Sequence, residues 1–240
     1  MQAVILAGGL ATRLGDLALS TAKSLLPVGG RPLLAWQLER LRASGFVDVL
    51  LCIGHLGSQV REFAGDGAAF GLDLRYAEDG PEPLGTAGAL RAALAELAPT
   101  FLVTYGDSYL PFDYSLPLRD LEAHPDALAS MSVFKNEGRF DRSNTEIRGD
   151  RVIRYEKGSQ DPAIDHIDYG ALALRRELIE TVPAANPQGL DQLQAVLARE
   201  GRLRAVLAKE RFYEIGTPFG LAELDRHLQQ LAARDRSKRG

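Results

Sequence analysis

The sequence has little cysteine, no excess of basic residues and no long apolar run. Cys52 is the only cysteine among 240 residues, which excludes a disulfide framework and a thiolate metal cluster. Because Cys52 lies inside an apolar run, we expect a buried, unreactive thiol. The formal net charge of -4 argues against a protein whose main task is to coat nucleic acid, since such a protein needs a basic face.

The apolar runs are also too short for a membrane helix. The first one ends at Gly8 and follows no basic leader, whereas a membrane helix needs about 20 apolar residues. We therefore expect a cytoplasmic protein without a membrane partner, in which only the charged segment 233–240 is typical of a solvated tail. Hydrophobic residues make up 45% and charged residues 25%, so we expect one compact domain over residues 1–240.

Short apolar runs alternate with amphipathic stretches through the first half of the chain. This alternation predicts strands at 2–6, 47–53, 72–76 and 101–105, joined by crossover helices at 32–43, 58–64 and 86–97 in a parallel sheet. Ser58 and Thr86 are typical N-cap residues for the last two helices.

The second half has several candidate strands in succession, at 128–134, 145–147, 152–155, 166–174 and 203–206. Helices are expected at 175–181 and 190–199, and Thr217 with Pro218 is typical of a helix start. Strands without intervening helices favour an antiparallel or mixed addition to the sheet. The expected fold class is therefore α/β and Rossmann-like: a mixed, mainly parallel sheet flanked by helices, with a smaller β-rich part.

The loop that follows the first strand combines glycines with cations. Gly8 and Gly9 permit positive φ and a close approach of backbone N–H groups to an anion, and Arg13 and Lys23 supply positive charge. These features suit a triphosphate, although a glycine turn with two surface cations stays open. A Walker A loop is disfavoured because Ala22 precedes Lys23, and no spacing in this loop matches GxGxxG.

The strand at 101–105 ends at the sequence Gly106-Asp107-Ser108. The carboxylate of Asp107 is thus expected at the carboxyl end of a strand, the edge where open α/β sheets bind ligands. Carboxylate oxygens are preferred ligands of Mg²⁺, so Asp107 is the first candidate for a magnesium ligand. The four histidines show no metal-ligand spacing, and we expect them to be structural or exposed.

Two segments resemble a known family. LAGGLATRL at 6–14 and KSLLPVGGRPLLAWQL at 23–38 are similar to the opening of the sugar-1-phosphate nucleotidyltransferases, and further similar stretches follow in order: EDGPEPLGTAGAL, VTYGDS, YEKG, DYGALAL and YEIGTP. The resemblance spans roughly 2–218 and is nearest to bacterial mannose- or heptose-1-phosphate guanylyltransferases. Ala11 departs from the family, which usually has glycine there.

The resemblance implies a GT-A-like nucleotidyltransferase fold that joins an NTP to a sugar 1-phosphate with the aid of Mg²⁺ and releases pyrophosphate. It implies a nucleotide-binding half at 1–110, a sugar-phosphate-binding half at 111–225, and a helix end with a charged tail at 226–240. In this reading Arg13 and Lys23 bind the triphosphate. Glu214, where the family commonly has aspartate, is the second magnesium ligand beside Asp107.

The resemblance also assigns the remaining contacts to substrate. Lys157 would bind the sugar phosphate, Glu156 the sugar hydroxyls, and the backbone at Gly170 would approach the sugar. Base and ribose recognition, with GTP favoured, falls to seven residues: Leu6, Ala7, Gly8, Gly9, Glu78, Gly85 and Thr86.

Two other functions stay open. One is a cytidylyltransferase that acts on a non-sugar phosphate or phosphonate, and the other is a regulatory module that binds a nucleotide or nucleotide sugar without turnover. The expected partners are NTP and sugar 1-phosphate, with no nucleic acid, and a homodimer is the default assembly.

Overall fold

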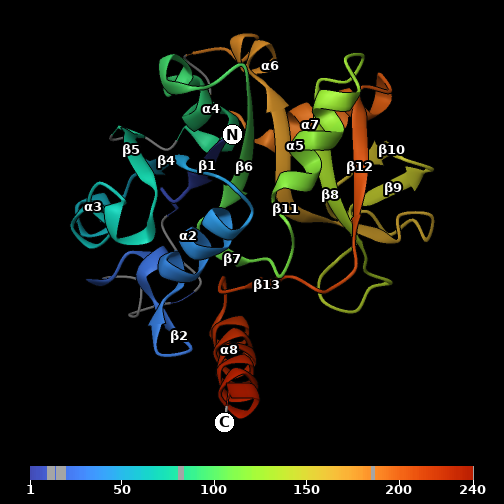
Figure 1. Cartoon of the computed structure of the whole chain (residues 1–240). Coiled ribbons are helices and arrows are strands. Elements are labelled where there is room, and N and C mark those ends of the chain that lie inside the picture. Colours follow the sequence, from blue (N-terminus) through green and yellow to red (C-terminus); the bar gives the residue numbers. More distant parts are fainter. Residues whose placement is uncertain (10–13, 15–19, 81–83, 185–186, 240) are drawn as a thin grey trace.

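A nine-stranded sheet forms the centre of the computed structural model, which describes residues 1–9, 14, 20–80, 84–184 and 187–239, the last five by their backbone alone (Figure 1). The strand order is β5-β4-β1-β6-β11-β8-β12-β10-β9. Four strands from the first half are parallel: β1 (Gln2–Leu6), β4 (Asp48–Ile53), β5 (Asp73–Glu78) and β6 (Thr100–Tyr105). The predicted parallel βαβ half is thus confirmed.

The second half adds the expected mixed strands: β8 (Ala129–Lys135), β9 (Thr145–Arg148), β10 (Arg151–Tyr155), β11 (His166–Arg175) and β12 (Leu203–Ala208). The long strand β11 pairs antiparallel with both β6 and β8, while β12 runs parallel to β8. Because β11 lies between β6 and β8, the strands of both halves form one sheet. The same end of this sheet therefore carries residues from both halves.

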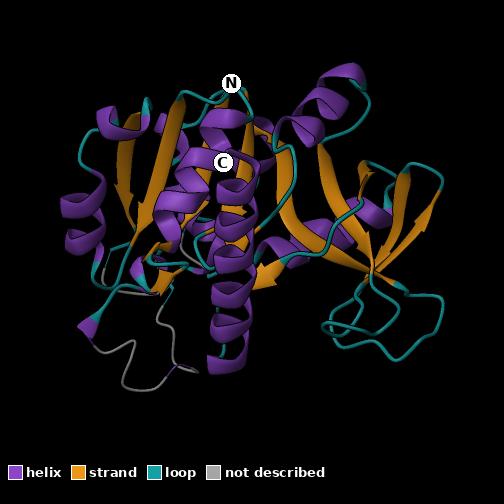
Figure 2. Cartoon of the chain, turned by 60° about the horizontal axis from the view of Figure 1, so that its bottom comes forward, coloured by secondary structure: helices purple, strands orange, loops and turns teal. Residues whose placement is uncertain are grey.

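Helices cover both faces of the sheet (Figure 2). The helices are α2 (Leu33–Ala43), α3 (Gly57–Ala64), α4 (Gly85–Ala92), α5 (Ser115–Ala123), α6 (Arg176–Glu180), α7 (Leu190–Arg199) and α8 (Pro218–Arg239). Successive strand residues point to opposite faces, so Ala3 and Ile5 of β1 pack with α2, whereas Val4 packs with α4. Cys52 is buried. Its burial and, to a smaller extent, the negative charge of Asp79 raise the pKa of its thiol to about 12.

The ends of several helices differ from the sequence prediction. The expected helix at 86–97 is divided into α4 and a separate 3-10 turn, Leu94–Glu96. Neither Ser58 nor Thr86 caps its own helix, since α3 begins at Gly57 and α4 at Gly85, both without a side-chain cap. The helix α5 was not predicted. Its start is fixed by Asp113 Oδ1, which accepts hydrogen bonds from Ser115 N at 2.9 Å and Ser115 Oγ at 2.7 Å.

The predicted start of α8 is confirmed, because Thr217 Oγ1 accepts a hydrogen bond from Gly220 N at 3.1 Å. The first half of α8 packs in a third apolar cluster, where Leu224 and Leu228 lie with Val28 and Ile215. Its second half extends away from the sheet toward the C-terminus (Figure 1), so the segment expected as a tail continues the helix to Arg239. None of the helices in the described part of the chain has the length and apolar character of a membrane span.

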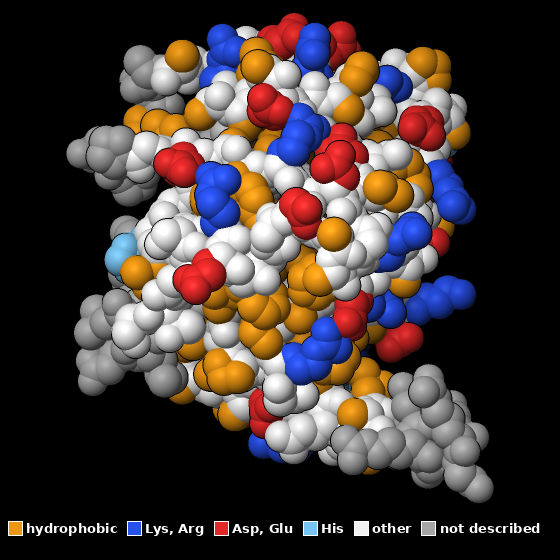
Figure 3. Space-filling model, turned by 60° about the vertical axis from the view of Figure 1, so that its left-hand side comes forward, with side chains coloured by type: hydrophobic (Ala, Val, Ile, Leu, Met, Phe, Trp, Pro, Cys, Tyr) orange, Lys and Arg blue, Asp and Glu red, His pale blue; other side chains and the backbone are white. Residues whose placement is uncertain are grey.

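The face that carries α3 and β5 bears Lys and Arg side chains scattered among Asp and Glu (Figure 3). The charges of both signs alternate over this face, and no continuous basic area gathers on the described part that it shows. This face therefore does not provide the electrostatic footprint that nucleic-acid coating needs.

Candidate active site

Asp107 and Glu214, the two predicted magnesium ligands, lie side by side. The short strands β7 (Ser108–Tyr109) and β13 (Tyr213–Glu214) pair antiparallel, with Glu214 opposite Ser108. In addition, Ile215 N donates a hydrogen bond to Asp107 O at 2.9 Å. The fold thus brings together two carboxylates that are far apart in the chain, at the end of the strand β6.

The environment of Glu214 is unusual for an exposed residue. Burial of the carboxylate and, to a smaller extent, the negative charge of Asp107 raise the pKa of Glu214 to about 7. The residue as a whole is nevertheless exposed to solvent. Lys23, in the 3-10 turn Lys23–Leu25, places its Nζ 2.5 Å from Asp107 Oδ2. One lysine therefore partly compensates two carboxylates.

These residues fit a divalent cation. Two like charges held together disfavour the ionised state, and a cation between them would restore it. An all-oxygen donor pair suits a hard ion such as Mg²⁺, which usually keeps water and substrate oxygens as its other ligands. Within the described residues, no group of three or more His, Cys, Asp or Glu could hold a metal by itself, so a bound ion would share its coordination with substrate and water.

The raised pKa of Glu214 predicts how stability depends on pH without metal. A carboxylate whose pKa is higher in the folded state than its ordinary value of 4.5 favours folding while protonated, and this contribution is lost as pH rises from about 4.5 through about 7. Glu214→Gln should therefore raise the melting temperature at pH 8 and change it little at pH 5. Thermal unfolding of both proteins in EDTA tests this. An equal shift at both pH values would contradict it.

The first-strand loop holds the predicted residues Leu6, Ala7, Gly8 and Gly9, while Arg13 and Ala11 lie outside the described residues. Ala7 N donates to Cys52 O at 2.8 Å and Leu6 O accepts from Gly106 N at 2.9 Å, so this backbone fixes the start of the loop. Neither glycine has a positive φ, so neither of them uses the left-handed conformation that glycine permits. Gly8 instead lies close to Asp79: a Cβ there would be 2.0 Å from Asp79 Oδ2, so this carboxylate would have to move.

The predicted base-binding residues Glu78, Gly85 and Thr86 also have structural contacts. Glu78 pairs with Arg61 of α3 at 3.1 Å. Gly85, at φ +73°, faces the backbone of Gln188, where a Cβ would lie 2.5 Å from the carbonyl oxygen. Thr86 Oγ1 accepts a hydrogen bond from Leu190 N at 2.7 Å, so this hydroxyl supports the start of α7 instead of α4.

The two roles of Thr86 can be separated by experiment. Thr86→Val keeps the shape and removes the hydroxyl, so loss of this cap-like bond should lower the free energy of unfolding by about 1 kcal/mol. If the hydroxyl acts only on α7, the KM for NTP stays unchanged in the folded variant. Chemical denaturation and steady-state kinetics check the two effects, and a large rise in KM without loss of stability would assign Thr86 to the nucleotide.

Of the predicted acceptor residues, Glu156 and Lys157 directly follow β10, and Gly170 lies in the middle of β11. Lys157 Nζ is 3.5 Å from Asp191 Oδ2 in the first turn of α7. Glu156 is exposed, and its backbone N donates to Asn144 O at 2.8 Å. Gly170 has φ +96° at the irregularity between Asp168 and Leu172 of β11, as the bulge interpretation predicted.

Sequence reasoning missed four residues that support this half: Asp168, Gln194, Tyr155 and Asn144. Asp168 Oδ1 accepts from Gly170 N at 3.0 Å, and Oδ2 accepts from Gln194 Nε2 at 2.8 Å and from Tyr155 OH at 3.3 Å. Burial raises the pKa of Asp168. Asn144 Oδ1 accepts from Asp168 N at 2.9 Å, so Asn144 links Glu156 to Asp168. The sequence did contain a signal for Asp168, because its carboxylate begins the otherwise apolar strand segment DYGALAL.

The nucleotide and acceptor halves meet around Tyr105. Burial raises the pKa of its hydroxyl, and the charges of Asp168, Asp107, Asp191 and Glu214 raise it further. Asp191, the partner of Lys157, and the Asp107–Glu214 pair thus influence the same hydroxyl.

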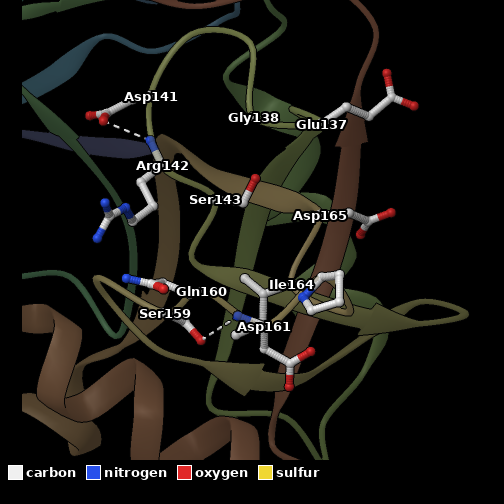
Figure 4. A pocket seen from close by; sticks show the side chains of 11 residues that line it. Glu137, Gly138, Asp141, Arg142, Ser143, Ser159, Gln160, Asp161, Ile164 and Asp165 are labelled. Carbon is white, nitrogen blue, oxygen red and sulfur yellow. Dashed lines mark hydrogen bonds between the residues drawn. The ribbon is translucent and has the colours of Figure 1, made fainter.

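A polar hollow of about 640 Å³ lies beside the acceptor half, between the loops that connect β8 to β9 and β10 to β11. Figure 4 shows Asp141 at one end of it and Asp161 at the other, with Ser143 and Gln160 between them. Asp141 also contributes to the raised pKa of Glu214. The hollow is lined by carboxylates, hydroxyls and an amide, which are groups that can form hydrogen bonds with hydroxyls.

The chain is similar to several known nucleotidyltransferases. N-acetylmuramate alpha-1-phosphate uridylyltransferase from Neisseria meningitidis serogroup B is 36% identical over 134 residues, or 54% of this chain and 57% of that protein. D-glycero-alpha-D-manno-heptose 1-phosphate guanylyltransferase from Campylobacter jejuni is 27% identical over 221 residues, or 91% of this chain and 96% of that protein. The crystal structure of HddC from Yersinia pseudotuberculosis complexed with GMP-PN superposes with a TM-score of 0.76 at 25% identity, covering 94% of this chain and 98% of that one.

The chain spans between 55% and 62% of the length of the first four curated relatives. The family model of the MobA-like NTP transferase domain matches residues 3–213, which include every predicted site residue except Glu214. The resemblance to sugar-1-phosphate nucleotidyltransferases and the GT-A-like α/β fold are both confirmed. This chain belongs to the family of MobA-like NTP transferase domains.

Proposed function

We propose that this chain transfers a nucleotidyl group from an NTP, with GTP preferred, to a mannose- or heptose-type sugar 1-phosphate and releases pyrophosphate with the aid of Mg²⁺. The observation that carries the proposal is the pairing of Asp107 with Glu214 beside Lys23. The guanylyl and heptose preference is supported by the relative from Campylobacter jejuni, which this chain matches over 96% of its length.

The reaction needs positioning more than acid–base chemistry. An oxygen of the sugar phosphate, already ionised near neutral pH, forms a bond to the α-phosphorus, and the bond between that phosphorus and the bridging oxygen to the β-phosphate breaks as pyrophosphate leaves. Lys157 would hold the attacking phosphate, and Asp168 with Asn144 would orient the strand ends around it. Proton removal by a histidine is therefore not required.

Asp107 and Glu214 would hold the metal ion, which when bound neutralises phosphate charge and aligns the reacting groups. When NTP binds, Lys23 would leave Asp107 and contact a phosphate oxygen instead. Its positive charge would then be compensated both with and without NTP. The resulting charge compensation explains why one lysine and two carboxylates lie together. Arg13, by resemblance, would add a second cation for the departing pyrophosphate.

The test is a matrix of NTPs against sugar 1-phosphates, followed by pyrophosphate release with and without Mg²⁺. We expect the highest kcat/KM for GTP with a mannose- or heptose-type 1-phosphate. A best pair of CTP with a phosphonate or a non-sugar phosphate would show the cytidylyltransferase alternative instead. Calorimetric binding of nucleotide without any pyrophosphate release would show a binding module.

A further inference from the structure

Asp79 carries a carboxylate without a hydrogen-bond donor. It directly follows β5, and its backbone N donates to Ile53 O at 2.9 Å. Its Oδ2 lies against Gly8, within 2.0 Å of where a Cβ would be, and 3.5 Å from the corresponding position at Gly54. None of the described residues donates a hydrogen bond to this half-buried carboxylate, and burial raises its pKa. Such a group calls for a donor from outside the chain.

The surroundings of Asp79 leave room for that donor. A hollow of about 520 Å³ lies at the ends of β4 and β5, lined by Asp79 together with Gly54, Gly57, Ser58 and Arg61. The neighbouring Glu78 is already paired with Arg61 at 3.1 Å. Glu62 also lines the hollow, but its side chain is exposed, whereas Asp79 is half-buried, so Asp79 is the carboxylate that gains most from a donor on a ligand in the hollow.

The order of the strands tells which part of a nucleotide would meet Asp79. Asp79 follows β5 and Asp107 follows β6, and the sheet order β5-β4-β1-β6 places β1 and its glycine loop between them. The three strand spacings amount to about 14 Å. Phosphates are drawn to the side of Lys23 and the metal ligands, and the negative charge of Asp79 repels them. The nucleoside end therefore points toward Asp79.

We propose that Asp79 determines the base by accepting two hydrogen bonds from guanine, one from N1–H and one from the exocyclic 2-amino group; this inference rests on the proposed function. Guanine alone among the common bases presents two adjacent donors on its Watson–Crick edge. Adenine and cytosine each place a ring acceptor beside their amino group, and uracil flanks its single N–H with two carbonyls. A carboxylate facing any of these loses a bond or meets an acceptor.

The test is a change of base preference in Asp79→Asn. The amide keeps one acceptor for N1–H and gains a donor, which suits the 2-carbonyl of xanthine and opposes the 2-amino group of guanine. We expect the ratio of kcat/KM for GTP to that for XTP to fall by roughly 10²-fold or more. Asp73→Asn, the same substitution at the exposed start of β5, should leave the ratio unchanged.

The outcomes separate this inference from the proposed function. If the wild-type protein transfers GMP but Asp79→Asn keeps the wild-type ratio, Asp79 does not determine the base and the proposed function stands. Suppose that the wild-type protein loses as much kcat/KM with 2'-deoxy-GTP as Asp79→Asn loses with GTP, and that combining the two changes causes no further loss. Asp79 then binds the ribose, and the inference is wrong. If no NTP is bound or turned over by the wild-type protein, the proposed function itself fails. A gain of XTP activity cannot come from misfolding, so it would support the inference directly.

Discussion

Asp107→Asn should lower kcat/KM for the proposed nucleotidyl transfer by roughly 10²–10³-fold, because the change removes one of the two carboxylates proposed to bind the metal and the partner of Lys23. Asparagine keeps the size and the oxygen that accepts a hydrogen bond from Ser108 Oγ at 3.2 Å, but it lacks the negative charge. The fold should persist, since β7 pairs with β13 through its backbone. Steady-state kinetics over a range of Mg²⁺ concentrations would show the loss, with a higher Mg²⁺ requirement in the variant.

A second measurement distinguishes this role from a general loss of structure. The charge of Asp107 helps to raise the pKa of Glu214, so that pKa should fall in Asp107→Asn, as NMR titration of the metal-free protein can show. Asp126→Asn, at an exposed aspartate that pairs with Arg151 at 2.9 Å, is the matched control and should keep full activity. Unchanged activity in Asp107→Asn would remove the proposed metal role.

The longer strands could be predicted where an apolar run ends near a glycine or a charged residue, whereas the two-residue strands β7 and β13 were not predicted. The runs at 2–6 and 101–105 became β1 and β6 within one residue. The helix α5 was missed because it is short and carries Pro117 near its start, which makes its apolar spacing hard to tell from a loop. The predicted N-cap role of Thr86 was wrong for a different reason. Its hydroxyl bonds to the start of α7, and the sequence around Thr86 does not indicate that contact.

The site was predictable where one motif carries a whole function, and less so where several segments meet. Asp107 and Lys23 come from contiguous motifs, and the structure joins them at 2.5 Å. Gln194 acts on Asp168 from a separate helix at 2.8 Å, and Asp79 faces Gly8 across the strand β4. Roles that depend on such tertiary contacts have no signal in the spacing of one segment.

Glu214 in particular depends on the helix that follows it. Gly220, in the first turn of α8, packs so closely that a Cβ there would lie 2.1 Å from Glu214 O. Thr217 Oγ1 holds Gly220 N in this place at 3.1 Å, and Ile215 is fully buried under Leu224. Packing against the helix α8 thus sets the position of Glu214 beside Asp107.

Gly220→Ala should therefore both destabilise the protein and impair the metal site, although alanine is the better helix former. In an ordinary helix position this change would add about 1 kcal/mol of stability. Here the methyl group must push β13 away from α8, and a displacement of about 1 Å at a reacting site costs on the order of 10²-fold in rate. We expect a lower melting temperature, a higher Mg²⁺ requirement and an unchanged KM for the sugar 1-phosphate.

The matched control for Gly220→Ala is Ala222→Gly, two residues further along α8 at an exposed position. It should cost about 1 kcal/mol through helix propensity alone and leave the Mg²⁺ requirement unchanged, because no contact to Glu214 is altered. Equal stability losses with different metal requirements would separate positioning of the carboxylate from weakening of the helix. A Gly220→Ala protein that is more stable and fully active would show that α8 does not set the position of Glu214.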